Sequence, residues 1–125
     1  IDIISSQHTP QDEESKRLPF EAAASGAVGL ETFLPAVLRL YHSGNLSLNQ
    51  IFKAASYNPA KRLGLHSGRI DIGAPADLML FDADVPYVLN RENLYSKSKN
   101  TPFDEARLQG KVLRTFVGGT EVYRS

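Results

Sequence analysis

The sequence predicts an α/β fold, and three features of the chain support this prediction. Three β-branched residues, Ile1, Ile3 and Ile4, make a short apolar run, which is typical of a strand buried on both faces. Apolar residues then recur at helical spacing after Gly29. Beyond residue 64, short apolar segments alternate with glycine-rich turns, as in antiparallel strands. We therefore expect a helical unit at residues 1–64 and a β unit at residues 65–125.

The predicted first strand runs into a long polar loop. Residues 5–17 offer hydroxyl, imidazole, amide, carboxylate and cationic groups, and Pro10 interrupts any regular strand. In α/β barrels, long loops after the carboxyl ends of strands form the active-site face. We expect the functional residues in this loop. The alternative is a disordered surface loop of the same composition.

An amphipathic helix is expected after this loop. Its apolar residues lie on one stripe from Leu30 to Tyr41. Because Pro35 lacks an N–H and is tolerated only in the first turn, the regular helix should begin between Thr32 and Leu34. Gly44 is a favourable helix stop.

A second helix is expected from Leu48 to about Ser56, with Ser47 as its N-cap. Asn58 should then cap a separate short turn that has Pro59 at its first position. Gly64 should end that turn.

Strand signals fill the rest of the chain. Residues 76–82 form a strand candidate and residues 87–89 a weaker one. The clearest pattern is a hairpin, in which residues 112–117 and 120–123 flank the turn Gly118-Gly119. The basic loop at residues 97–100 is interpreted as a solvated surface remote from substrate.

Composition narrows the function classes. Fourteen basic residues balance fourteen acidic ones, which gives no overall field to attract nucleic acid or a membrane surface. Cysteine is absent, which excludes disulfides and thiolate metal sites and agrees with a cytoplasmic location. No apolar run approaches the roughly 20 residues of a membrane span. The expected partners are a small molecule and other protein surfaces.

Five blocks carry a recognisable pattern. They are residues 6–10 (Ser-Gln-His-Thr-Pro) with 28–32, residues 56–60 (Ser-Tyr-Asn-Pro-Ala) with 63–65, residues 68–78, residues 98–103 and residues 110–112. In order and spacing these blocks resemble the dihydroorotases of the amidohydrolase superfamily. Allantoinases and hydantoinases are related alternatives.

The resemblance implies a fold and a reaction. It implies that residues 1–64 are the last strand and helices of a TIM-like barrel, followed at residues 65–125 by part of a small β-sandwich. The chain, at 125 residues, is shorter than the roughly 250 of a complete barrel, so we expect a C-terminal portion of a longer enzyme. The family reaction interconverts N-carbamoyl-aspartate and dihydroorotate in pyrimidine biosynthesis with zinc. The zinc-binding strands have no match here, and we expect no zinc on this portion alone.

The resemblance also assigns site residues. Gln7 occupies the position of the family aspartate that binds zinc and acts as general base, and His8 follows it. Gln11 replaces a substrate-contacting histidine, whereas Ser25 and Gly26 match a pair whose backbone contacts substrate, with Ser25 in place of phenylalanine. A neutral amide cannot accept a proton as a carboxylate does, but it can still bind substrate by hydrogen bonds. We expect catalytic positions at Gln7 and His8, with no metal ligand in the set.

Two functional interpretations remain. One is a cyclic amide hydrolase that works as a homo-oligomer. The other is a catalytically dead homologue that acts as a structural partner of aspartate carbamoyltransferase. Gln7 favours the second, whereas Pro10, Gly26 and Gly29 favour the first. The acidic run at residues 12–14 is interpreted as solvated rather than catalytic, because adjacent side chains point in different directions.

Overall fold

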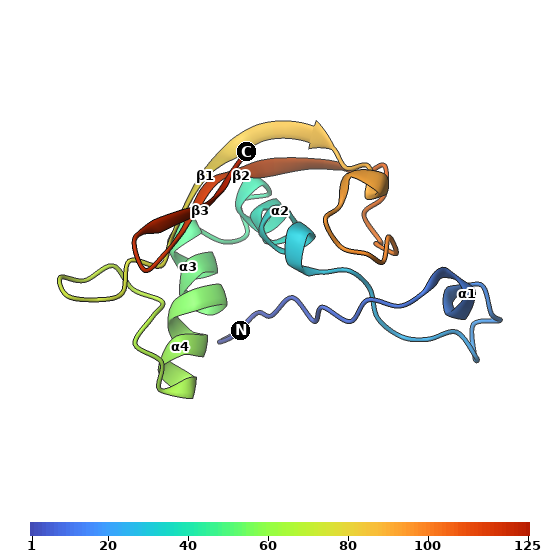
Figure 1. The fold of residues 1–125 in the computed structure, drawn as a ribbon, viewed down its shortest axis with the longest axis horizontal. Helices are drawn as coiled ribbons and strands as arrows, with labels where there is room; N and C mark the ends of the chain where they lie inside the picture. Colours follow the sequence, from blue (N-terminus) through green and yellow to red (C-terminus); the bar gives the residue numbers. More distant parts are fainter.

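A three-stranded antiparallel sheet lies over a layer of helices in the computed structural model, which describes residues 1–125 (Figure 1). The strands are β1 (Leu78–Val88), β2 (Arg107–Val117) and β3 (Thr120–Arg124), in the order β1-β2-β3. The expected hairpin is confirmed, with Gly118 and Gly119 both at positive φ in the turn. A sandwich needs a second sheet, and this chain supplies one sheet only. A second sheet is therefore not among these residues, so the sandwich portion stays a prediction, and helices lie beside the one sheet.

The two separate strand candidates after residue 75 join into the single strand β1. Its pairing with β2 shifts register between Leu80 and Phe81 and again between Asp82 and Pro86. Such irregularities bend a strand and break its alternating pattern, which explains why the sequence shows two short segments. Pro86 is tolerated because β1 pairs with β2 alone and leaves its other edge free.

Helix α2 (Leu30–His42) packs under β2. It begins before the predicted start, and Pro35 lies inside it. The missing Pro35 N–H removes only the helical bond to the Glu31 carbonyl, so the helix continues through it. Its predicted end is confirmed: Gly44 has φ +74°, and the Asn45 N–H donates to the Leu40 carbonyl at 2.9 Å.

The second helical region is one continuous helical segment, whereas the sequence predicted a helix and a separately capped turn. It comprises α3 (Leu48–Phe52), a π-helical turn at Lys53–Tyr57 and α4 (Asn58–Leu63). Ser47 caps α3 as predicted. Asn58 does not act as a cap, because its backbone is already helical and its side-chain amide donates to the Asp2 carbonyl at 2.7 Å. No helix in the structure is long and apolar enough to cross a membrane.

The first residues do not form the predicted strand. Ile1 is fully exposed and Ile3 is 44% exposed. The backbone bond that ties this segment to the helices runs from the Ile4 N–H to the Ala54 carbonyl, at 3.0 Å. A buried strand requires neighbouring strands, and β1 to β3 lie on the far side of the helices (Figure 1). The α/β composition is observed, but a barrel strand is not.

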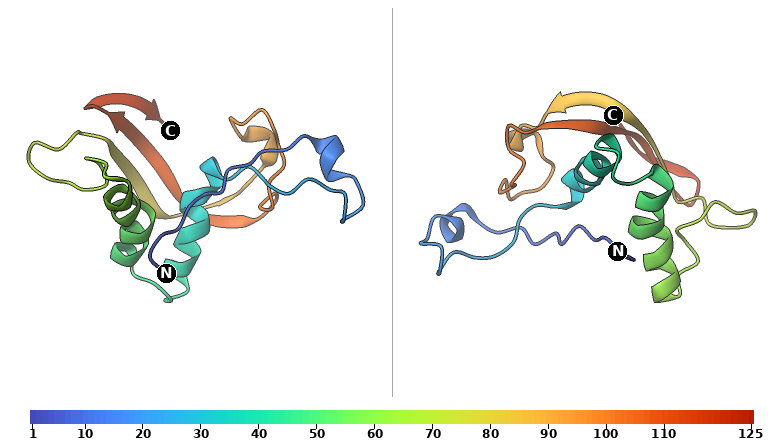
Figure 2. Two further views of the ribbon diagram at one scale, coloured as in Figure 1. Left: turned by 90° about the horizontal axis from the view of Figure 1, so that it is seen from below. Right: turned by 180° about the vertical axis from the view of Figure 1, so that it is seen from behind.

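A small apolar cluster holds the next part of the chain in place. We call residues 89–106 the β1–β2 excursion, and they include a short 3₁₀ turn at Arg91–Asn93. The excursion reaches from the sheet toward the N-terminal loop in each view of Figures 1 and 2. Leu89 and Leu94 of the excursion pack with Val28 and Leu108, and all four are buried. The sheet therefore supports the loop in which the predicted functional residues lie.

Candidate functional site

Two segments of the N-terminal loop lie side by side, and we call residues 5–30 the paired loop. His8 and Ala27 form a parallel β-bridge, and the Thr9 N–H donates to the Ala27 carbonyl at 3.0 Å. Glycine is required where the two segments meet. A Cβ atom at Gly26 would overlap the Thr9 carbonyl oxygen, and one at Gly29 would overlap the Ser6 carbonyl oxygen.

His8 lies at the N-terminus of α2. Its Nδ1 atom accepts hydrogen bonds from the N–H groups of Gly29, at 3.0 Å, and Leu30, at 3.3 Å. A ring nitrogen that accepts two bonds carries no proton, so the neutral ring holds its hydrogen on Nε2. His8 thus satisfies two N–H groups that the first turn of a helix leaves unpaired, and it keeps one donor for a ligand.

Gln7 lies in the same segment but is exposed. Its backbone has a left-handed φ of +47°, and its side-chain amide donates to Ser5 Oγ at 2.9 Å. The Thr9 hydroxyl donates to the Gln7 carbonyl at 3.2 Å. All these bonds are local, so the structure does not join Gln7 to the other predicted site residues by hydrogen bonds.

The three predicted substrate-binding residues do come together. The Gln11 side-chain amide donates to the Ser25 carbonyl at 3.1 Å. Gln11 and Gly26 share a partner, since the Asn100 side chain contacts the Gln11 N–H at 3.2 Å and the Gly26 carbonyl at 3.1 Å. These bonds leave several groups free for a ligand: the N–H groups of Ser25 and Gly26 and the Gln11 side-chain oxygen have no partner within the chain.

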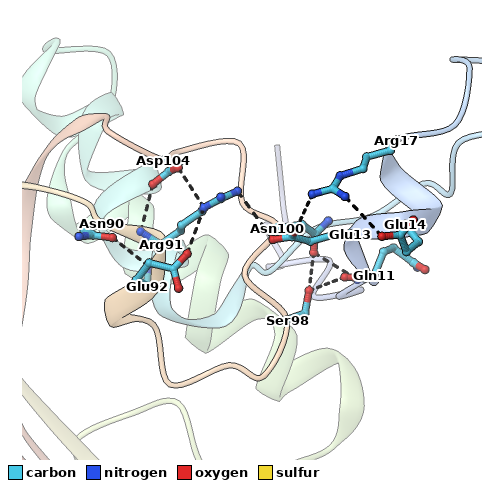
Figure 3. A network of polar contacts seen from close by, with 10 residues as sticks. All are labelled: Gln11, Glu13, Glu14, Arg17, Asn90, Arg91, Glu92, Ser98, Asn100 and Asp104. Carbon is cyan, nitrogen blue, oxygen red and sulfur yellow. Dashed lines mark hydrogen bonds and ion pairs between the residues drawn. The ribbon is translucent and has the colours of Figure 1, made fainter.

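The sequence interpretation missed residues that hold this arrangement. Figure 3 shows Ser98 and Asn100 against Gln11, and both are half-buried, so a solvated surface is the wrong description of this part of residues 97–100. Lys16 donates to the carbonyls of Ala24, at 2.6 Å, and Gly26, at 3.3 Å. The available signal was the block at residues 98–103, which matches the family pattern, but Lys97 and Lys99 led to the interpretation of residues 97–100 as a solvated surface.

The excursion is also attached to the start of α2 and, through one exposed ion pair, to the paired loop. Glu31, in the first turn of α2, accepts bonds from the N–H groups of Tyr95, at 2.9 Å, and Ser96, at 3.0 Å. Arg91 pairs with Asp104 at 3.5 Å and lies 4.0 Å from Glu13 (Figure 3). The ion pairs are exposed and contribute little energy, whereas the bonds to Glu31 fix the excursion at the start of α2.

The acidic run at residues 12–14 is exposed, as predicted, and has local structural roles. Asp12 caps α1 (Glu13–Lys16) by accepting from the Ser15 N–H at 2.7 Å. That hydrogen bond holds the pKa of the Asp12 carboxyl below its usual value. A carboxylate with a lowered pKa is a weak proton acceptor. Glu13 and Glu14 both pair with Arg17.

The site residues do not fit the zinc that the resemblance implies. The structure contains no group of three or more histidine, cysteine, aspartate or glutamate side chains arranged to hold a metal ion. His8 offers one ring nitrogen, because backbone N–H groups occupy the other. Gln7 supplies a neutral amide, which is a poor ligand for zinc. These residues can bind and orient a polar ligand, but they do not form a metal site.

Gly26 tests the close contact in the paired loop. Replacing Gly26 with Ala should lower the free energy of unfolding more than Gly73→Ala does, by about 1–3 kcal/mol. Both glycines have positive φ, but only at Gly26 would the added Cβ overlap another residue. Chemical denaturation of both variants measures the difference. Equal losses would show that the two segments do not lie as close as described.

Comparison with known proteins places these features in a family. The amidohydrolase family profile matches residues 18–122. The dihydroorotase of Wolbachia sp. subsp. Drosophila simulans (strain wRi) is 45% identical over 123 residues, which make up 98% of this chain and 28% of that protein. This chain therefore spans less than a third of the length of such relatives.

Solved structures of hydantoinases and dihydropyrimidinases have a fold similar to that of this chain. The dihydropyrimidinase from Brevibacillus agri NCHU1002 superposes with a TM-score of 0.91 and 26% identity over 99% of this chain and 28% of its own. The L-hydantoinase (dihydropyrimidinase) from Arthrobacter aurescens is 34% identical with a TM-score of 0.79, over 83% of this chain and 24% of its own. Sequence and structure together show that this chain belongs to the amidohydrolase family.

Proposed function

We propose that this chain provides the substrate-binding loop of a dihydroorotase-like enzyme, which interconverts N-carbamoyl-aspartate and dihydroorotate. The observation that carries the proposal is the convergence of Gln11, Ser25 and Gly26 in a loop anchored at His8. Relatives named dihydroorotase support it with identity across nearly the whole chain. In this proposal the complete enzyme is a zinc-dependent, cytoplasmic homo-oligomer, with the metal ligands outside these residues.

The free polar groups of the loop suit a cyclic amide that carries a carboxylate. Such a ring presents carbonyl oxygens and N–H groups along its edge. The unpaired N–H groups of Ser25 and Gly26 can donate to carbonyl or carboxylate oxygens, and the Gln11 side-chain oxygen can accept from a ring N–H. His8 can donate through Nε2 to an oxygen atom of the substrate. These contacts orient the ring and exchange no proton.

The paired loop lacks a side chain that can act as the general base in hydrolysis. Gln7 has no carboxylate, and the Asp12 carboxylate already accepts the capping hydrogen bond of α1. Neither side chain is suited to accept the proton of an attacking water molecule. We therefore propose that the natural protein binds dihydroorotate but hydrolyses it slowly.

Gln7 also favours a second candidate function. A homologue without its general base could persist as a structural partner of aspartate carbamoyltransferase. Two apolar side chains in the turn before β1, those of Ile70 and Ile72, are almost completely exposed. They offer an apolar surface for such an assembly. Sedimentation of the full-length gene product with aspartate carbamoyltransferase tests this candidate, which predicts a mixed complex and no turnover of a cyclic amide.

A substrate panel tests the main proposal. The full-length gene product should hydrolyse dihydroorotate in preference to hydantoin and dihydrouracil, because only dihydroorotate has a carboxylate for the N–H groups of the loop. Steady-state assays of ring opening give the three values of kcat/KM. Faster opening of hydantoin or dihydrouracil would instead assign the chain to the other branch of the family.

A further inference from the structure

We infer that Asn100 is a positioning residue, which holds Gln11 and Gly26 at the separation that the substrate requires. The inference deepens the proposed function and rests on it. Asn100 lies in the β1–β2 excursion, far along the chain from both residues, and is half-buried between them. Three of its four polar groups contact the paired loop.

The contacts of Asn100 use both ends of its side-chain amide. The Oδ1 atom accepts from the Gln11 N–H at 3.2 Å, and Nδ2 donates to the Gly26 carbonyl at 3.1 Å. Its backbone carbonyl accepts from the Val28 N–H at 2.9 Å. One side chain therefore bridges the two segments of the loop at the two positions that are proposed to contact substrate.

Only an amide of this length can make both contacts. Aspartate could accept from the Gln11 N–H but would place a second oxygen against the Gly26 carbonyl. The orientation of the Asn100 amide is fixed by the Gln11 N–H, which can only donate and therefore faces Oδ1. The Ser98 hydroxyl lies within hydrogen-bond reach of Oδ1, at 2.8 Å, and of the Gln11 carbonyl, and its single hydrogen serves one of these oxygens at a time. With Oδ1 facing the Gln11 N–H, Nδ2 faces the Gly26 carbonyl.

The excursion gives Asn100 a firm base. Backbone bonds close it at its root, from the Leu89 N–H to the Ala106 carbonyl at 3.0 Å and from the Glu105 N–H to the Leu89 carbonyl at 2.9 Å. Leu89 and Leu94 bury its inner face, and Glu31 binds its backbone at Tyr95 and Ser96. The sheet thus sets the position of Asn100, and Asn100 sets the position of the loop.

Hydrogen exchange tests the bridge without any enzyme activity. In the full-length gene product, Asn100→Ala removes the acceptor of the Gln11 N–H but leaves the backbone acceptor of the Val28 N–H. We expect exchange at Gln11 to become at least about tenfold faster, while Val28 changes less. Asn100→Asp should keep Gln11 protected. Unchanged exchange at Gln11 in Asn100→Ala would overturn the inference.

Kinetics tests whether the bridge serves substrate binding. Asn100→Ala should raise the KM for dihydroorotate about tenfold and change kcat less, because Asn100 acts through binding groups rather than on the reacting atoms. Asn90→Ala is the matched control, since Asn90 lies in the same excursion and only caps the turn at Glu92. An unchanged KM with altered exchange would overturn the positioning role. If the natural protein neither binds nor hydrolyses dihydroorotate, the proposed function fails, and the exchange result alone decides whether Asn100 holds the loop.

Discussion

Replacing Gln7 with Asp in the full-length gene product is expected to raise the rate of dihydroorotate hydrolysis by about 10²–10⁴-fold, which is the usual contribution of a general base. Gln7 precedes His8 in the paired loop and is exposed, with its side chain bonded only to Ser5. Its φ of +47° lies in the left-handed region, which aspartate tolerates better than most residues. The substitution should therefore add a carboxylate without disturbing the loop.

Asp12→Asn is the control for this prediction. Because the Asp12 carboxylate caps α1 and has a lowered pKa, its removal should leave the hydrolysis rate of the natural protein unchanged. Asparagine can still accept from the Ser15 N–H, so α1 should remain capped. Full activity in the natural protein that disappears in Asp12→Asn would place the base at Asp12. Low activity in the natural protein and in both variants would favour the structural-partner function.

His8→Ala is expected to lower the free energy of unfolding by about 1–3 kcal/mol and to weaken the binding of dihydroorotate. The alanine leaves the N–H groups of Gly29 and Leu30 without their acceptor and also removes the free Nε2 donor. His8→Asn separates the two effects. Its side-chain oxygen can replace Nδ1 as acceptor, so this variant should regain stability but not binding.

The matched control for His8 is His66→Ala. His66 is exposed beyond the end of α4, and its loss should change the free energy of unfolding by less than about 0.5 kcal/mol. Urea unfolding measures stability, and calorimetric titration with dihydroorotate measures binding. A His8→Ala variant as stable as His66→Ala would show that the imidazole does not support the start of α2.

Local signals predicted the helices and the hairpin well. The stop of α2 at Gly44 and the Gly118-Gly119 turn depend on neighbours within a few residues, and both are observed. The predicted apolar stripe of α2 is observed only in its middle, because Val37 and Leu38 are buried whereas Leu30 and Tyr41 at its ends are exposed. Residues 1–4 were predicted as a strand and are not one, because a buried strand depends on neighbouring strands. The sandwich portion stays a prediction for a related reason, since the alternating pattern of a strand does not specify what covers its face and only one sheet is present here.

The arrangement of the candidate site was predicted in part, whereas the roles of its residues stay predictions. The resemblance pointed to Gln11, Ser25 and Gly26, and the structure brings these three together. Sequence spacing could not reveal Asn100, because the contact between its side chain and Gly26 spans 74 positions and depends on how the excursion folds back from the sheet. The capping role of His8 was also missed, since it requires the loop to return to the start of α2.

Hydrogen exchange of the full-length gene product, with and without dihydroorotate, tests whether the paired loop holds the substrate, because binding does not require the missing base. We expect dihydroorotate to slow exchange within the paired loop, above all at Ser25 and Gly26, whose N–H groups have no partner within the chain. Amides of β3, on the far edge of the sheet, should not change. Binding that leaves residues 5–30 unchanged, or no binding at all, would contradict the claim that this loop holds the substrate.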